Sequence, residues 1–314
     1  MDSLPQEIVD EIIDNLPHSS LRSSSLVAKR WRKRSQQRAL NKIDLRSEFM
    51  VNRWHIDTRS DPGGISSCIQ SAGFPGIVEW KDRALFSRIL RNFNSLRRLR
   101  MSNTEIPNEV LEDISRGEFG DRITALYFWD MRSSFVIPMI LVFPNLQTLV
   151  VHNLTVSSTE PPFVHPAQSQ RRTLDSLQVA WCTSGAVEAL ENLQLTASRL
   201  ILDVQTENVQ KLLIVSSLTV VELVLLGLCL LCVDRKSIND DPTDSLRKTT
   251  SHLIDLPPFP VLTSLKVLIT AFEPSPHLIN TLSPISSAPA LESVELECLR
   301  QKLLSSNTWG DLDG

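Results

Sequence analysis

The apolar positions of the first forty-five residues follow a helical period. Ile8, Ile12 and Leu16 recur every fourth residue and are flanked by prolines, which predicts a short amphipathic helix. Serines in the segment 18–21 predict the start of a second short helix, and the segment 27–32 predicts a third. We therefore expect the chain to open with three short helices.

Three helices of this length bury little apolar area. A segment of about 40 residues usually needs a disulfide, a metal or a partner to be stable. The first cysteine is Cys68, so a protein partner is the natural inference. The basic run 29–34, together with Arg38, allows two interpretations: a nuclear-localisation or nucleic-acid patch, or the solvated cationic end of the third helix, which we favour.

A different pattern recurs in the rest of the chain, with two apolar residues three positions apart and a third two positions later. Its copies are Leu96-Leu99-Met101, Ile123-Leu126-Phe128, Leu146-Leu149-Val151, Leu174-Leu177-Val179, Leu218-Val221-Leu223, Leu262-Leu265-Val267 and Leu291-Val294-Leu296, with a weaker one at Ala197-Leu200-Leu202. They start 21–29 residues apart, except for one interval of 44, which is twice 22. Asn103 and Asn153 each stand two residues after a copy, and segments 143–146 and 259–262 share a Phe-Pro entry.

This repetition predicts an α/β solenoid of short parallel strands joined by helical or irregular return segments. A leucine-rich α/β protein could produce single copies by chance, but the number and spacing of the copies favour a repeat. Side chains between the core positions would point to the opposite, concave face and are candidates for holding a protein substrate. These are Arg98, Arg100, Tyr127, Trp129, Thr148, Val150, His152, Gln178, Glu222, Lys266 and Glu295.

Two alternatives remain open on this face. Tyr127 and Trp129 are either anchors for a bound partner or members of the core. Arg98 and Arg100 are candidates to meet a phosphate.

The first forty residues carry a family resemblance. The residues that carry it are Leu4-Pro5-x-Glu7-Ile8, Ile12, Leu16-Pro17, Leu21, Ser25-Leu26-Val27 and Trp31-Arg32. In order and spacing they resemble the F-box, with Ala28 where Cys or Ser is usual and Ser20 where an acidic residue often stands. The later triplets look like the irregular leucine-rich repeats that follow many F-boxes. A generic helical cap is the alternative that we disfavour.

The resemblance implies docking to the Skp-type adaptor of an SCF ubiquitin ligase, and through it to a cullin scaffold. The residues that match adaptor-binding or supporting positions are Leu4, Pro5, Ile8, Leu16, Leu21, Val27 and Trp31. The expected role is a substrate-recognition subunit, in the cytoplasm or nucleus, whose repeats hold an unknown protein for ubiquitination. A scaffold that binds an adaptor outside any ligase is the alternative.

The domain organisation expected from these patterns has four parts. They are an F-box over 1–45, a connecting segment or degenerate first repeats over 46–90, a leucine-rich-repeat-like domain over 91–305, and a tail over 306–314.

Composition adds mainly exclusions. The net charge of −4 gives no whole-chain attraction to nucleic acid, and five cysteines, odd in number and mostly far apart, suit a reducing compartment. The N-terminus is neither basic nor apolar, which argues against a secretory signal. The apolar run 212–233 is long enough for a membrane span, but Glu222 and the repeat phase favour repeat core; an error in the gene model is a further alternative.

Motifs for chemistry are absent from the sequence. Cys229 and Cys232 have no second ligand pair and are interpreted as core, and the six histidines are dispersed. No nucleophile elbow, Walker loop or dinucleotide fingerprint occurs. We therefore expect a non-catalytic protein without cofactor or metal.

Overall fold

The computed structural model describes residues 4–59, 64–76, 83–104, 106, 110–111, 120–156, 172–203, 209–228, 256–269 and 288–298. The chain divides into two compact units, residues 1–160 and 161–314. The division falls inside the region expected to be one repeat domain. Residues 157–171 and 229–255, which include Cys229 and Cys232, and the tail 306–314 lie outside the described residues.

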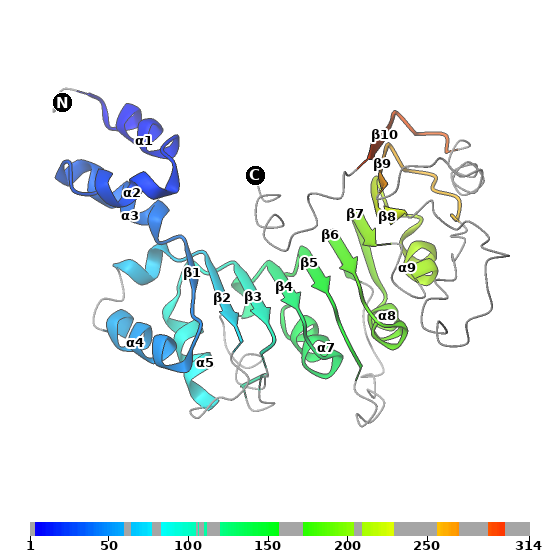
Figure 1. Ribbon diagram of the computed structural model, residues 1–314, viewed down its shortest axis with the longest axis horizontal. Helices are drawn as coiled ribbons and strands as arrows, with labels where there is room; N and C mark the ends of the chain where they lie inside the picture. The colour runs from blue at the N-terminus through cyan, green and yellow to red at the C-terminus, as the bar shows by residue number, and fades with distance from the viewer. Residues whose placement is uncertain are drawn as a thin grey trace, which may run out of the picture. The chain divides into compact units, whose positions relative to one another are not determined.

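Unit 1 combines the three N-terminal helices with parallel strands and helical returns (Figure 1). The N-terminal helices are α1 (Gln6–Asp14), α2 (His18–Ser24) and α3 (Lys29–Ala39). The strands are β1 (Lys42–Asp44), β2 (Ser71–Pro75), β3 (Arg98–Ser102), β4 (Ala125–Trp129) and β5 (Thr148–His152). The returns contain α4 (Glu48–Arg59), the 3-10 turns η1 (Ile65–Cys68) and η2 (Gly120–Arg122), α5 (Arg83–Asn92) and α7 (Ser133–Val142).

Unit 2 repeats the same scheme without an N-terminal helical module among its described residues. Its strands are β6 (Arg172–Ala180), β7 (Leu195–Asp203), β8 (Glu222–Leu228), β9 (Ser264–Ile269) and β10 (Ser293–Cys298). Its helices are α8 (Ser184–Glu191) and α9 (Val209–Ser216). Within each unit the strands follow chain order and each is parallel to its neighbour, so the mixed α/β class with parallel strands is confirmed.

The apolar triplets lie in register across the strands. Leu99 pairs with Leu126, which pairs with Leu149, and all three side chains are fully buried. Unit 2 continues the pattern, with Leu200 paired to Leu223. Each buried side chain therefore stacks on its equivalent in the next strand, which makes one continuous core within a unit.

The structure adds two strands that the search for triplets missed. Ile69, Ala72 and Phe74 are fully buried and occupy the triplet positions of β2, and Phe74 packs on Phe86 of α5 with ring centroids 4.8 Å apart. Leu40, Ile43 and Leu45 occupy the same positions around β1. The segment 46–90 thus contains strand β2, which pairs with both β1 and β3.

Two predicted triplets need correction. Leu218 and Val221 are exposed, and register places Val220, Leu223 and Leu225 in the core of β8 instead. A run rich in leucine and valine offers two possible phases, and pairing with β7 selects one of them. In β10, Val294 and Leu296 lie in register with the buried pair of β9 but remain exposed.

A recurring hydrogen bond fixes where each strand starts. The carbonyl oxygen of Gln70 accepts from the backbone N–H groups of both Arg97 and Arg98, and the carbonyl of Arg97 accepts from Thr124 and Ala125. In unit 2, the carbonyl of Val221 accepts from residues 263 and 264 in the same way. The carbonyls of Asn41, Thr124 and Thr263 each accept two N–H groups of the following repeat in the same way, so the residues before β1 to β4, β8 and β9 are tied to the same place in the next repeat.

The strand ends also follow one rule. The residue after each of β2 to β6 has a positive φ: Gly76 (73°), Asn103 (45°), Asp130 (53°), Asn153 (52°) and Trp181 (54°). Asn103 and Asn153 are exposed turn residues, one position before the place where leucine-rich repeats carry Asn or Cys. That place is held here by buried Thr104, Met131, Leu154 and Cys182. These two asparagines therefore serve the turn and do not form a buried ladder.

The apolar run 212–233 is not one helix where it is described. Residues 212–216 belong to α9, and residues 222–228 form β8. Leu212 and Leu213 are buried on α9. Across the described ranges, no helix has both the length and the apolar character that a membrane span requires.

Truncation of one core leucine should test the register directly. Leu149→Ala removes a fully buried side chain and should lower the free energy of unfolding by about 2–5 kcal/mol. The neighbouring Thr148→Ala, on the opposite side of β5, should change it by about 0.5 kcal/mol or less. Chemical denaturation of both variants measures the difference, and equal losses would contradict the register.

Candidate protein-binding surfaces

Helix α1 carries two apolar stripes. Val9 and Ile13 are fully buried and pack with Leu21 of α2. Ile8 and Ile12, whose spacing predicted the helix, lie on the other stripe and are exposed, at 42% and 38%. The periodicity was therefore right about the helix, but it identified the outward stripe and not the buried one.

The exposed stripe is part of a larger apolar set, which we call the N-terminal apolar surface. Its members are Leu4, Pro5, Ile8 and Ile12 around α1, and Leu26 and Val27 between α2 and α3. Leu26 is 79% exposed and Val27 58% exposed. Exposed apolar residues gathered in so small a module are typical of a protein-docking surface.

The structure separates the seven predicted docking residues into two groups. Leu4, Pro5, Ile8 and Val27 are exposed. Leu21 is fully buried, and Leu16 and Trp31 are partly buried against the same cluster, so these three support the surface from beneath. Ile12 and Leu26 belong to the exposed set and were not among the predicted site residues.

Three arginines of α3 hold α1 in place. Arg34 binds the carboxylate of Asp14 with two hydrogen bonds, one of them 2.8 Å from Nε to Oδ1. Arg38 donates to the carbonyls of Ile13 and Leu16 at the end of α1, and Arg30 donates to the carbonyl of Leu4. The hydrogen bonds from Arg34 keep the pKa of Asp14 below its usual value.

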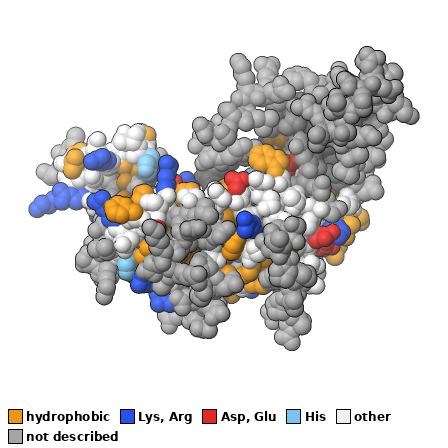
Figure 2. All heavy atoms as spheres, turned by 60° about the horizontal axis from the view of Figure 1, so that its bottom comes forward, with side chains coloured by type: hydrophobic (Ala, Val, Ile, Leu, Met, Phe, Trp, Pro, Cys, Tyr) orange, Lys and Arg blue, Asp and Glu red, His pale blue; other side chains and the backbone are white. Residues whose placement is uncertain are grey.

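This clamp (Arg30, Arg34 and Arg38) decides how the basic run is used. The three clamp arginines are half of the basic residues in the run; they are spaced four residues apart and face α1. The other half, Lys29, Arg32 and Lys33, stay exposed. Over the N-terminal helices, Lys and Arg side chains share the surface with hydrophobic ones (Figure 2). The run is thus in part an internal element of the helical module.

The comparisons with known proteins now bear on this module. Residues 1–42 match the F-box domain. F-box domains generally bind Skp-type adaptors, and this one suggests a role in an SCF-type ubiquitin ligase. No curated protein matches the chain.

A second surface lies on the strands, on the side opposite the buried triplets; we call it the open face of each unit. In unit 1 it includes the row formed by Asp44, Gly73, Arg100, Tyr127 and Val150, each paired with the next across the strands. The remaining predicted positions there are Arg98, Trp129, Thr148 and His152. Register places all seven predicted residues of unit 1 on this face.

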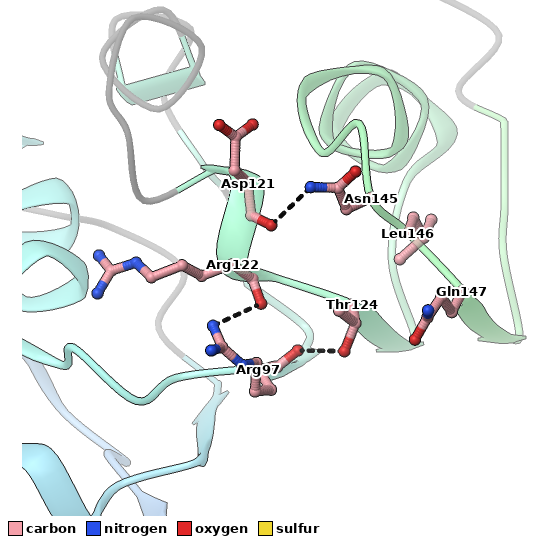
Figure 3. A pocket seen from close by; sticks show the side chains of 7 residues that line it. All are labelled: Arg97, Asp121, Arg122, Thr124, Asn145, Leu146 and Gln147. Atoms are coloured by element: carbon pink, nitrogen blue, oxygen red, sulfur yellow. Dashed lines mark hydrogen bonds between the residues drawn. The ribbon is translucent and has the colours of Figure 1, made fainter.

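A pocket of about 440 Å³ lies beside the residues that precede strands β3, β4 and β5 (Figure 3). Its polar groups are hydrogen-bonded to one another: Asn145 donates to the carbonyl of Asp121 at 2.9 Å, and Arg97 donates to the carbonyl of Arg122 at 3.3 Å. These bonds tie one repeat to the next, so we interpret this pocket as a structural joint.

A second hollow, of about 620 Å³, runs along β2 on the open face. Its lining includes Gly73, Phe74 and Pro75 of β2. Over that glycine, Arg100 Nη2 binds Asp44 Oδ1 at 2.8 Å, and a side chain at position 73 would collide with the Asp44 carboxylate. Arg100 is therefore neutralised, which weakens its candidacy as a phosphate ligand.

The aromatic residues of the open face form a contiguous group. Tyr127 and Trp129 stack with centroids 5.9 Å apart and planes 8° apart, and Trp129 meets His152 at 6.1 Å. Tyr127 and Trp129 are half-buried, between the two predicted alternatives. Val150 and His152, predicted as surface contacts, are buried. The stacked pair presents a rigid contact area beside the hollow, which Trp129 also lines.

The open face of unit 2 is more strongly charged. Arg199 pairs with Glu222 at 3.2 Å, and Lys266 Nζ lies 3.2 Å from Glu295 and 2.9 Å from Glu297. The hydrogen bonds from Lys266 to Glu297 and Glu295 raise the pKa of Lys266, and the one to Glu297 has the larger effect. Gln178, Glu222, Lys266 and Glu295 thus lie where the repeat predicted them. Their partners Arg199 and Glu297 were not among the predicted residues. Arg199 lies on β7, directly across from Glu222 of β8, and Glu297 lies two positions after Glu295 on β10.

Within the ranges that the structure describes, no cluster of His, Cys, Asp or Glu is arranged to hold a metal ion. Cys68 and Cys182 form no disulfide with another described residue.

The buried imidazole predicts a pH dependence. Burial lowers the pKa of His152 to about 4, against a smaller opposing effect of Asp130. Between pH 6.5 and 4, the unfolded chain binds a proton that folded His152 does not, so stability should fall as the pH falls through this window, by about 3 kcal/mol in total.

The control for this prediction is His152→Phe, which keeps a ring but cannot titrate. Denaturation from pH 7 to pH 4 should show a shallower loss of stability in the variant, because the side chain at position 152 no longer takes up a proton in the unfolded chain. Identical pH profiles would show that His152 contributes nothing to the dependence.

Proposed function

We propose that this protein is the substrate-recognition subunit of an SCF-type ubiquitin ligase. Residues 1–42 would dock onto the Skp-type adaptor, and through it onto a cullin scaffold, while the repeat domain binds the protein to be ubiquitinated. The observation that carries the proposal is the N-terminal apolar surface, displayed by a helical module that matches the F-box domain.

The energetics of the module support docking. Its fully buried apolar side chains are Val9, Ile13 and Leu21, with Leu16, Trp31 and Ala39 partly buried against them. Against this small core stand six exposed apolar residues, which water solvates poorly. Covering them with an adaptor would remove apolar area from water at about 25 cal/mol per Å². Association with a partner is thus a favourable way to complete the module.

The open face of unit 1 supports the second half of the proposal. It combines a hollow, a stacked aromatic pair and the ion pair between Arg100 and Asp44. The hollow is lined by two acidic residues, Asp44 and Asp130, and two basic ones, Arg46 and Arg100. This balance favours a protein segment of mixed character over a highly charged one such as nucleic acid.

The chain would take no part in the chemistry of ubiquitin transfer. Its contribution would be proximity, because a bound substrate is presented to the ligase at a high effective concentration. This non-catalytic role agrees with the lack of catalytic motifs in the sequence.

Adaptor docking is tested with a matched pair of double variants. Ile8→Ala/Ile12→Ala removes two exposed apolar side chains of α1, whereas Glu7→Ala/Glu11→Ala removes two exposed charges of the same helix. The first pair should weaken binding of a purified Skp-type adaptor by at least about tenfold, and the second by less than about threefold. Titration calorimetry measures the affinity of each double variant for the adaptor, and circular dichroism confirms that both are folded. Equal affinities would contradict the proposal.

Recovery of a cullin scaffold with the wild-type chain separates a ligase subunit from an adaptor-binding scaffold. We expect the cullin to copurify in proportion to the adaptor. Adaptor without cullin would favour the scaffold.

Substrate holding is tested in the background that cannot dock. Ile8→Ala/Ile12→Ala should trap substrates without ubiquitinating them, so proximity labelling should enrich a set of proteins with it. Adding Tyr127→Ala/Trp129→Ala should reduce that set by about tenfold if the aromatic pair is part of the binding surface. Adding Asn192→Ala, an exposed residue beside α8, is the control and should leave the set unchanged.

A further inference from the structure

The hollow on the open face of unit 1 follows a row of residues at the strand ends. Pro75 of β2 pairs with Ser102 of β3, which pairs with Trp129 of β4. Arg46, two positions after the last residue of β1, continues this row on the other side of Pro75. All four residues line the hollow, with Arg46 at the β1 end and Trp129 at the β4 end. The two residues between these ends have short side chains.

Four charged side chains line the hollow, and two of them already form a pair. Arg100 Nη2 lies 2.8 Å from Asp44 Oδ1. Asp130, the residue after β4, accepts a hydrogen bond from the neutral amide of Asn153, so its charge is not compensated. Arg46 and Asp130 are both exposed, and neither forms an ion pair with any residue that the structure describes. The hollow is therefore positive at its β1 end and negative at its β4 end.

We propose that this hollow binds an extended segment of the substrate protein that carries an acidic and a basic side chain four residues apart. The acidic side chain pairs with Arg46, and the basic side chain lies over the indole of Trp129, beside Asp130. A cation on the face of an indole gains a further attraction from the ring. This inference deepens the proposed function and rests on it, since the segment belongs to the protein that the repeat domain would hold.

The strands set the spacing of the two charges on the ligand. Arg46 and Trp129 are three strands apart in one row, a separation of about 14 Å at the usual distance of about 4.8 Å between neighbouring strands. An extended segment advances about 3.3 Å per residue, so residues four positions apart span about 13 Å and point to the same side. Spacings of two or six residues would span about 7 or 20 Å and match the two ends less well.

The same charges disfavour a ligand of a single sign. A nucleic acid or an acidic run would place negative charge beside Asp130. A basic run would place positive charge beside Arg46, and beside the exposed Lys42 and Arg98 on the same face. Either ligand would be repelled at one end of the hollow, whereas a segment with both charges is attracted at each end.

The first test selects ligands without assuming their sequence. A random-peptide library displayed on phage is depleted on the immobilised Arg46→Glu/Asp130→Asn variant and then selected on the immobilised full wild-type chain. The enriched sequences should share an acidic and a basic residue four positions apart. Moving the basic residue of such a peptide by two positions should lower its affinity by at least about fivefold. No enrichment, enrichment of one charge sign, or equal affinity for the shifted peptide would each overturn the proposal.

The second test exchanges the charges of one pair. Replacing the acidic residue of an enriched peptide by Lys should lower its affinity for the wild type by at least about tenfold, and Arg46→Glu should restore it to within about threefold of the original value. Failure of this exchange to restore binding would overturn the pairing with Arg46. Lys42→Gln, an exposed basic residue of β1 that does not line the hollow, is the matched control and should change the affinity by less than about twofold.

Asp130→Asn tests the other end of the hollow. It should lower the affinity of the original peptide by about threefold to fivefold. The unfolding equilibrium should not change, because Asn holds the equivalent positive-φ positions 103 and 153. Unchanged peptide affinity would overturn the role of Asp130.

Adaptor binding is measured in parallel to keep the two proposals apart. Arg46→Glu/Asp130→Asn should leave the affinity for the Skp-type adaptor unchanged. Failure of the wild type to bind the adaptor would contradict the proposed function, whereas failure of the peptide selection would contradict only the ligand class assigned to the hollow.

Discussion

The constraint on which the rest of the structure depends is the way in which the start of each strand is bonded to the start of the next. One carbonyl, such as that of Gln70 or Arg97, accepts two N–H groups from the following repeat. This bond sets the register, and the register decides which side of a strand faces the core. The residues of the open faces owe their position to this register, because a slip of one residue would exchange the two faces.

Much of this arrangement could be predicted from the sequence, because a stacked core requires apolar residues at fixed intervals. What could not be predicted is instructive. The repeat at β2 was missed because Ala72, a small residue, occupies a triplet position that usually holds a larger apolar one. The neighbouring Phe74 supplies core volume there. The phase of β8 was lost because leucine and valine fill nearly every position there, so only pairing with β7 distinguishes Val220 from Leu218.

The N-terminal module shows a different limit. Its first helix is apolar on two sides, and periodicity alone does not say which side faces inward. The buried pair Val9 and Ile13 was overlooked because Ile8 and Ile12 give the same spacing one position earlier. An outward apolar stripe is ambiguous in a lone sequence because the partner that would cover it is a different chain. On the open face, by contrast, the alternation of strands placed the predicted residues correctly, and only burial by neighbours removed Val150 and His152 from the surface.

The arginine clamp links electrostatics to docking in the F-box module. Arg30, Arg34 and Arg38 donate hydrogen bonds to α1 and to the residue that precedes its N-terminal end, and α1 is the helix that displays Ile8 and Ile12. Any polyanion that engaged all three guanidinium groups would compete with Asp14 and the backbone carbonyls at the ends of α1, and so would loosen the helix that displays Ile8 and Ile12. Under the proposed function, occupancy of the basic run would therefore oppose assembly with the adaptor, and this competition would weaken as ionic strength rises.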